Sequence, residues 1–182
     1  MPEQPMPEQP VLNFLVPACQ APDAYGPRMA EALRAAGWTV TTHALPGGYP
    51  LVDQSAILAA DIAVSRLPDG AAVLVDGLAL PGVAAALSID SRRLRLVALI
   101  DRLLWREPGL NADEAAARRN LEQGALALMR AVAVPDAEGA AEATALGLAP
   151  EAVRVVSPDA GAAAALAAVL RSGPEPTVNT PA

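Results

Sequence analysis

Four short runs of the chain are apolar almost from end to end, and these runs limit most strongly what the chain can fold into. They are VLNFLV at 11–16, AVLVD at 72–76, LRLVALI at 94–100 and AVAV at 131–134. A strand with one solvated face alternates apolar and polar residues, whereas a strand covered on both faces is apolar throughout. The runs therefore predict a mostly parallel sheet with helices on both of its faces.

The first run opens a complete β-α-β unit, which occupies residues 11–46. Its middle segment, 26–36, carries Met29 and Leu33 on one stripe, as an amphipathic helix does, and Gly37 is placed to end that helix. The same alternation continues along the chain. Strands are expected at 11–16, 38–44, 72–76, 94–100, 131–134 and 153–156, and helices at 26–36, 53–65, 81–87, 112–130, 137–147 and 159–171. The predicted fold is a doubly wound, mostly parallel, Rossmann-like α/β sheet.

One domain is expected, over residues 11–171. Residues 1–10 repeat the sequence MPEQP, and residues 172–182 are again rich in proline, so both ends are predicted to be disordered tails. The N-terminus has neither a basic segment nor an apolar one, so no signal peptide is expected. No apolar run approaches the roughly 18 residues of a membrane-spanning helix. The expected location is the cytoplasm, with no integral membrane segment.

The charged residues exclude several classes of function. The net charge is −7, which disfavours nucleic acid as a partner. All 13 cationic residues are arginine, so a Schiff-base lysine and a P-loop lysine are both excluded. Cys19 and His43 are the only residues of their types, which excludes a Cys/His zinc site. Carboxylates alone could still form a magnesium site, but no pattern demands a metal or a cofactor, and none is expected.

The loops that follow the strands are the expected ligand-binding edge, because ligands of open parallel sheets bind at the carboxyl ends of the strands. The most charged of these loops follows the fourth strand and contains Asp101, Arg102 and Arg106. Asp101 is the candidate catalytic residue, as a general base, and the two arginines are candidates for binding a phosphate or a carboxylate. A solvated loop with an internal ion pair is an equally weighted interpretation.

Two further loops supply candidate ligand-binding residues. Asp76 and Gly77 end the third strand, where the aspartate could accept hydrogen bonds from a sugar hydroxyl or, as we favour, cap the next turn. Tyr25 and Gly26 stand where the first strand's loop meets the next helix. That loop has no G-x-G-x-x-G pattern, so a dinucleotide site is not expected.

Other suggestive residues are interpreted as structural. His43 lies at the carboxyl end of the second strand, but no G-x-S-x-G sequence accompanies it, so a hydrogen-bonded structural histidine is favoured over a catalytic one. Glu114 and Glu122 match the E-x7-E spacing of retaining glycosyltransferases. The helix that carries them lacks the expected glycine-rich context, so the match is interpreted as chance.

A set of segments also resembles a known family in its order and spacing. The segments are RMAEALRAAGWTV at 28–40, HALPG at 43–47, LPDG at 67–70, VLVDGLAL at 73–80, RLRLVALI at 93–100, LGLAPE at 146–151 and VRVVSP at 153–158. Together they resemble the N-terminal, acceptor-side domain of bacterial GT-B glycosyltransferases of family 4, over residues 11 to about 160. The resemblance implies half of a GT-B fold and a role with a nucleotide sugar and an acceptor glycan or lipid.

Three loops depart from the family pattern. CQAPDAYG at 19–26 stands where the family has a glycine pair, DRLL at 101–104 where it often has His-His-Pro-Leu, and PDAE at 135–138 where it has a Thr-Ser segment. The 182 residues also correspond to the acceptor-side domain alone. The resemblance therefore implies the acceptor-binding half of a retaining transferase, inactive alone and dependent on a donor-domain subunit. The alternative is a catalytically inactive relative that binds a sugar ligand or a protein, and association into a homo-oligomer through the uncovered cleft face is also expected.

Overall fold

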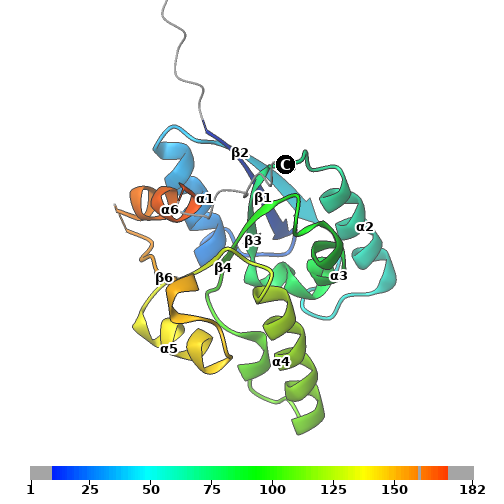
Figure 1. The fold of residues 1–182 in the computed structure, drawn as a ribbon. Coiled ribbons are helices and arrows are strands. Elements are labelled where there is room, and N and C mark those ends of the chain that lie inside the picture. The colour runs from blue at the N-terminus through cyan, green and yellow to red at the C-terminus, as the bar shows by residue number, and fades with distance from the viewer. Residues whose placement is uncertain (1–9, 160, 172–182) are drawn as a thin grey trace, which may run out of the picture.

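The computed structural model describes residues 10–159 and 161–171, which form one six-stranded parallel sheet with helices on both faces (Figure 1). The predicted doubly wound α/β fold is confirmed. The strands are β1 (Val11–Pro17), β2 (Thr39–Leu45), β3 (Ala72–Asp76), β4 (Arg95–Leu99), β5 (Ala131–Val134) and β6 (Val153–Val155). The helices are α1 (Tyr25–Ala35), α2 (Gln54–Ser65), α3 (Leu80–Asp90), α4 (Ala112–Leu126), α5 (Ala137–Ala145) and α6 (Ala162–Arg171). The expected tails at 1–10 and 172–182 lie, apart from Pro10, outside the described residues.

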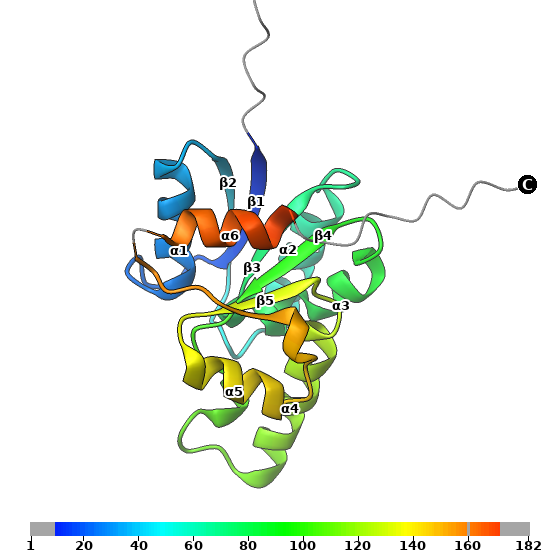
Figure 2. The ribbon, with the colours of Figure 1, turned by 60° about the vertical axis from the view of Figure 1, so that its left-hand side comes forward.

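The sheet separates two apolar cores. Leu12, Phe14 and Val16 of β1 pack with α1 and α6 on one face, whereas Leu15 of the same strand belongs to the core under α2, α3, α4 and α5. Successive side chains of a strand point to opposite faces, so an apolar run supplies both cores at once. Figure 2 shows α1 and α6 side by side, away from α4 and α5.

The helix boundaries follow local capping. Asn111 and Glu114 form a capping box at the start of α4, and the side chain of Asp53 caps α2. Short 3-10 turns, which the sequence did not predict, follow β3, β4 and α5. They are η1 (Gly77–Ala79), η2 (Leu104–Arg106) and η3 (Pro150–Ala152).

The strand order is β2-β1-β3-β4-β5-β6. The chain moves outward from β1 to β2 on one side and from β3 to β6 on the other, so the order reverses between β1 and β3. The loops after these two strands therefore leave in opposite directions and open a crevice between them. Ligands of doubly wound sheets bind at such a point, and the candidate site lies there.

Candidate functional site

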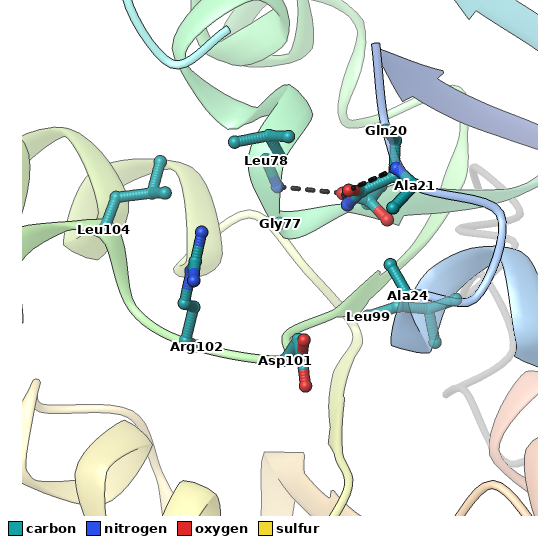
Figure 3. Close-up of a pocket in the computed structure, with 10 residues that line it drawn as sticks. Gln20, Ala21, Ala24, Gly77, Leu78, Leu99, Asp101, Arg102 and Leu104 are labelled. Atoms are coloured by element: carbon teal, nitrogen blue, oxygen red, sulfur yellow. Dashed lines mark hydrogen bonds between the residues drawn. The ribbon is translucent and has the colours of Figure 1, made fainter. Parts of the chain in front are cut away.

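A cavity of about 220 Å³ lies at the carboxyl ends of β1, β3 and β4 (Figure 3). It is lined by Gln20, Ala21 and Ala24 from the β1–α1 loop, Asp76, Gly77 and Leu78 after β3, and Leu99, Asp101, Arg102 and Leu104 after β4. The register of the sheet explains this grouping. Asp76 pairs with Leu99, so Asp101 stands only two residues beyond the partner of Asp76 at the same edge.

Asp76 is the buried polar group of the cavity, with 2% of its surface exposed. Its Oδ1 atom accepts hydrogen bonds from the backbone N–H of Leu78 and from Nε2 of Gln20, both at 3.0 Å. Burial, with a smaller contribution from the nearby charge of Asp101, raises the pKa of Asp76 to about 6, although the two hydrogen bonds oppose the shift. The favoured capping interpretation is confirmed, and the carboxylate also faces the cavity.

Asp101 and Arg102 come from the β4–α4 loop and are exposed at the mouth of the cavity. The Arg102 side chain is 73% exposed, and its only ion-pair partner among the described residues is Glu107, at 3.8 Å. In Figure 3 the Arg102 side chain rises from the loop into the space between Leu104 and Gly77. A cationic group with so weak an internal partner is available to an anionic ligand.

The base of this loop is anchored by Glu122 of α4, which is 1% exposed. Its carboxylate accepts hydrogen bonds from the backbone N–H groups of Leu104, at 2.7 Å, and Trp105, at 3.0 Å. Arg118 completes the anchor by binding Glu107 and the carbonyl of Leu104. Burial raises the pKa of Glu122, and the two backbone donors oppose that shift. Glu122 thus acts on loop structure, in agreement with the chance interpretation of its spacing from Glu114.

The structure brings Asp76, Gly77, Asp101 and Arg102 together around one cavity and places the other three predicted residues elsewhere. Tyr25 is buried, and its hydroxyl donates to the carbonyl of Val156 at 2.8 Å. Gly26 does not line the cavity but packs against Oδ2 of Asp76, where an added Cβ would lie 3.2 Å from Asp76 Cγ. Arg106 pairs with Glu142 at 2.8 Å and stacks on the Trp105 ring, so it is not a lining residue.

Gln20 is the polar lining residue that the sequence prediction missed. It follows β1 in a loop that was expected to face the ligand, but nothing in the sequence pairs it with Asp76, 56 positions away. His43 has the favoured structural role, with Nε2 2.9 Å from Oδ1 of Asn13 on the neighbouring strand, and burial lowers its pKa.

Within the part of the chain that the structure describes, no three His, Cys, Asp or Glu side chains are grouped so as to hold a metal ion. Nor does any helix of that part have the length and apolar character needed to cross a membrane.

The fold and the site define the chain as a Rossmann-like parallel α/β protein with a polar crevice at the point where its strand order reverses. No protein-family model matches the chain, and no curated protein matches its sequence. The resemblance to family 4 glycosyltransferases therefore stays a hypothesis, and function has to be argued from the site.

Proposed function

We propose that the chain is a glycosyltransferase-like domain that holds the sugar-bearing acceptor in the cavity beside Asp76 and Asp101. The donor nucleotide sugar is supplied by a separate donor-domain chain. The observation that carries the proposal is the convergence of two carboxylates and one amide, from three different strand ends, on a single small cavity. Carboxylate and amide groups in such a crevice suit the hydroxyls of a sugar, which both donate and accept hydrogen bonds.

The size of the cavity supports placing the acceptor sugar on this chain and the nucleotide sugar on another chain. At about 220 Å³ it is smaller than the roughly 300–1,000 Å³ of sites that enclose a whole drug-sized ligand. A single sugar ring is a better match to that volume than a complete nucleotide sugar. The nucleotide therefore belongs on another surface, as the resemblance to an acceptor-side domain implies.

Each polar group has a distinct role in the proposed complex. Oδ1 of Asp76 already accepts two internal hydrogen bonds, whereas no described residue donates to Oδ2, which is left to accept from a sugar hydroxyl. Asp101 is the proposed general base. As the acceptor oxygen bonds to the anomeric carbon of the donor, the proton of that oxygen passes to Asp101. The bond between the anomeric carbon and the diphosphate breaks, and its electron pair stays on the departing diphosphate. Arg102 offsets the negative charge that develops on that leaving group.

A second candidate function is binding without catalysis, as a sugar-ligand or protein-binding module. The observation that favours it is that the two most charged loop positions, Asp101 and Arg102, stand where the resembled family often has histidines. Arg106, which the sequence also offered for binding an anion, is already paired with Glu142. If this alternative is correct, the same cavity binds the sugar, but no partner chain makes the protein catalytically active.

The proposal is tested by titrating the full chain with methyl glucoside, glucose 1-phosphate and a uridine diphosphate sugar. Backbone ¹⁵N chemical shifts report binding. Binding of the first two with shifts at Gly77 and Asp101 is expected. Asp101→Asn should weaken both ligands and Arg102→Gln mainly the phosphate. Asp61→Asn and Arg92→Gln are matched controls, because both residues are exposed and lie outside the cavity. Absence of sugar binding would overturn the proposal.

Catalysis is tested separately by purifying the chain with its native partners and measuring hydrolysis of the nucleotide sugar. Activity that depends on Asp101 and Arg102 supports the split transferase. Activity that survives Asp101→Asn and Arg102→Gln contradicts the catalytic roles given to them. Binding with no activity in any native complex favours the inactive module.

A further inference from the structure

An apolar groove of about 520 Å³ adjoins the polar cavity, and the two share Leu104 as a wall. The groove runs between the β2–α2 loop, the first turn of α3 and the side of α4. Its apolar lining includes Leu51, Val52, Ile57, Pro81, Leu104 and Leu121. Leu51 is 78% exposed and Ile57 38% exposed, so both present apolar surface to whatever enters.

The charged side chains that line the groove are all bound within the chain. Asp53 accepts from the backbone N–H of Ala56 and from the hydroxyl of Ser55, both at 2.8 Å. Arg118 binds Glu107 and the Leu104 carbonyl, and Glu122 accepts from two backbone N–H groups. Asp53 keeps its charge at the exposed edge of the groove, with no ion-pair partner among the described residues, and an uncharged apolar occupant would leave all of these bonds intact.

We propose that the groove binds the uncharged aliphatic chain of an amphipathic acceptor whose sugar head lies in the adjoining cavity. The inference rests on the proposed function and names the class of acceptor. Three observations carry it: the volume falls within the range of small-molecule sites, most of the lining side chains are apolar, and the groove shares Leu104 with a cavity that offers polar contact. An acceptor that spans Leu104 would satisfy both environments at once.

The test uses the full chain and a series of n-alkyl β-glucosides from methyl to octyl, each below its micelle concentration. Affinity is measured from ¹⁵N chemical shifts. Each methylene buried in the groove should tighten binding by about twofold to fourfold. Leu51→Asp, and as a second variant Ile57→Asp, should make affinity independent of chain length while methyl glucoside binding is unchanged. Ile89→Asp is the matched control, because Ile89 is also 78% exposed but lies outside this groove.

The outcomes separate the two proposals. If methyl glucoside binds but affinity does not rise with chain length, the groove proposal is overturned and the proposed function stands. If the rise persists in both groove variants, the chain binds elsewhere and the groove proposal is again overturned. If methyl glucoside leaves Gly77 and Asp101 unshifted, the proposed function itself fails.

Discussion

Gly26 and Asp76 pack against each other so closely that a side chain at position 26 would overlap the Asp76 carboxylate. A Cβ built on Gly26 would clash with Oδ2 of Asp76 and lie 3.2 Å from both Asp76 Cγ and Phe14 Cζ. Gly26 belongs to the first turn of α1, so the helix approaches the end of β3 without an intervening side chain. The buried carboxylate of the proposed site therefore depends on a glycine in another element.

Gly26→Ala is expected to destabilise the fold by about 1 to 3 kcal/mol. The new methyl group forces the Asp76 carboxylate to move, and its hydrogen bonds from Leu78 and Gln20 weaken. Urea denaturation of the variant and the parent protein measures the change. In an Asp76→Ala background the same substitution should cost clearly less, because the atoms that clash are gone.

Gly124→Ala is the matched control for that substitution. Gly124 lies inside α4, and an added Cβ would meet no atom of a described residue within 4 Å apart from the backbone of its own helix and its chain neighbours. Alanine is a better helix former than glycine, so Gly124→Ala should stabilise the fold by up to about 1 kcal/mol. Equal losses from the two substitutions would show that the contact with Asp76 is not the cause.

Asp76→Asn is expected to stabilise the fold at neutral pH and to have no such benefit in acid. Burial raises the pKa of Asp76 to about 6, so the folded state favours the protonated form, and the stability contributed by that preference is lost as the pH rises through 6. The gain from asparagine should therefore be near zero below about pH 4 and reach at most about 3 kcal/mol above about pH 7. Thermal unfolding across this range measures it.

The comparison between variant and parent matters here because other groups titrate in the same range. Burial raises the pKa of Glu122 and lowers that of His43, so the two give the parent protein opposing slopes of stability against pH. Both groups are present in both proteins and cancel in the difference. A difference that does not change with pH would contradict the burial of an ionisable Asp76.

The fold was predictable from the sequence because strands covered on both faces need continuous apolar runs, and all six expected strands are present. The ends of the elements were less predictable. The third helix extends to Leu80–Asp90, beyond the expected 81–87, and α4 ends at Leu126 rather than near 130. Such ends depend on capping and tertiary contacts, which apolar periodicity does not report.

Part of the candidate site was also predictable, because some of its residues lie at the ends of the predicted strands. Asp76 ends β3, Gly77 follows it, and Asp101 and Arg102 come shortly after β4, so chain order alone places these residues at one edge. The side-chain direction of Tyr25 depends on a carbonyl 131 positions away, and that of Gln20 on a carboxylate 56 positions away. No local pattern in the sequence carries such pairings.

Tyr25→Phe is expected to cost about 1 kcal/mol of folding stability. The buried Tyr25 hydroxyl donates to the carbonyl of Val156, and phenylalanine would leave that acceptor without its donor. Tyr49 provides the contrast, since its buried hydroxyl has no hydrogen-bond partner among the described residues. Tyr49→Phe should therefore be neutral or stabilising. The urea midpoints of the two variants measure both effects. A larger loss of stability from Tyr49→Phe than from Tyr25→Phe would contradict the stabilising role given to the Tyr25 hydroxyl.

Glu122→Ala is expected to release the loop that carries Asp101 and Arg102. The substitution leaves the backbone N–H groups of Leu104 and Trp105 without their acceptor, at a cost of about 2 to 4 kcal/mol. Glu122→Gln should cost less, because its amide oxygen can still accept one of the two hydrogen bonds. Hydrogen exchange at the amides of Leu104 and Trp105 should accelerate far more than exchange in β1, and urea denaturation gives the energy.

The exposed Glu151 supplies the control for the loss of a carboxylate, because its side chain makes no hydrogen bond within the described residues. Glu151→Ala should change the free energy of unfolding by less than about 0.5 kcal/mol and leave the Leu104 amide protected. If Glu122→Ala accelerates exchange uniformly over the whole sheet, the carboxylate supports the fold as a unit. Acceleration confined to the loop means that α4 holds the β4–α4 loop, and with it the cavity mouth, through this one side chain.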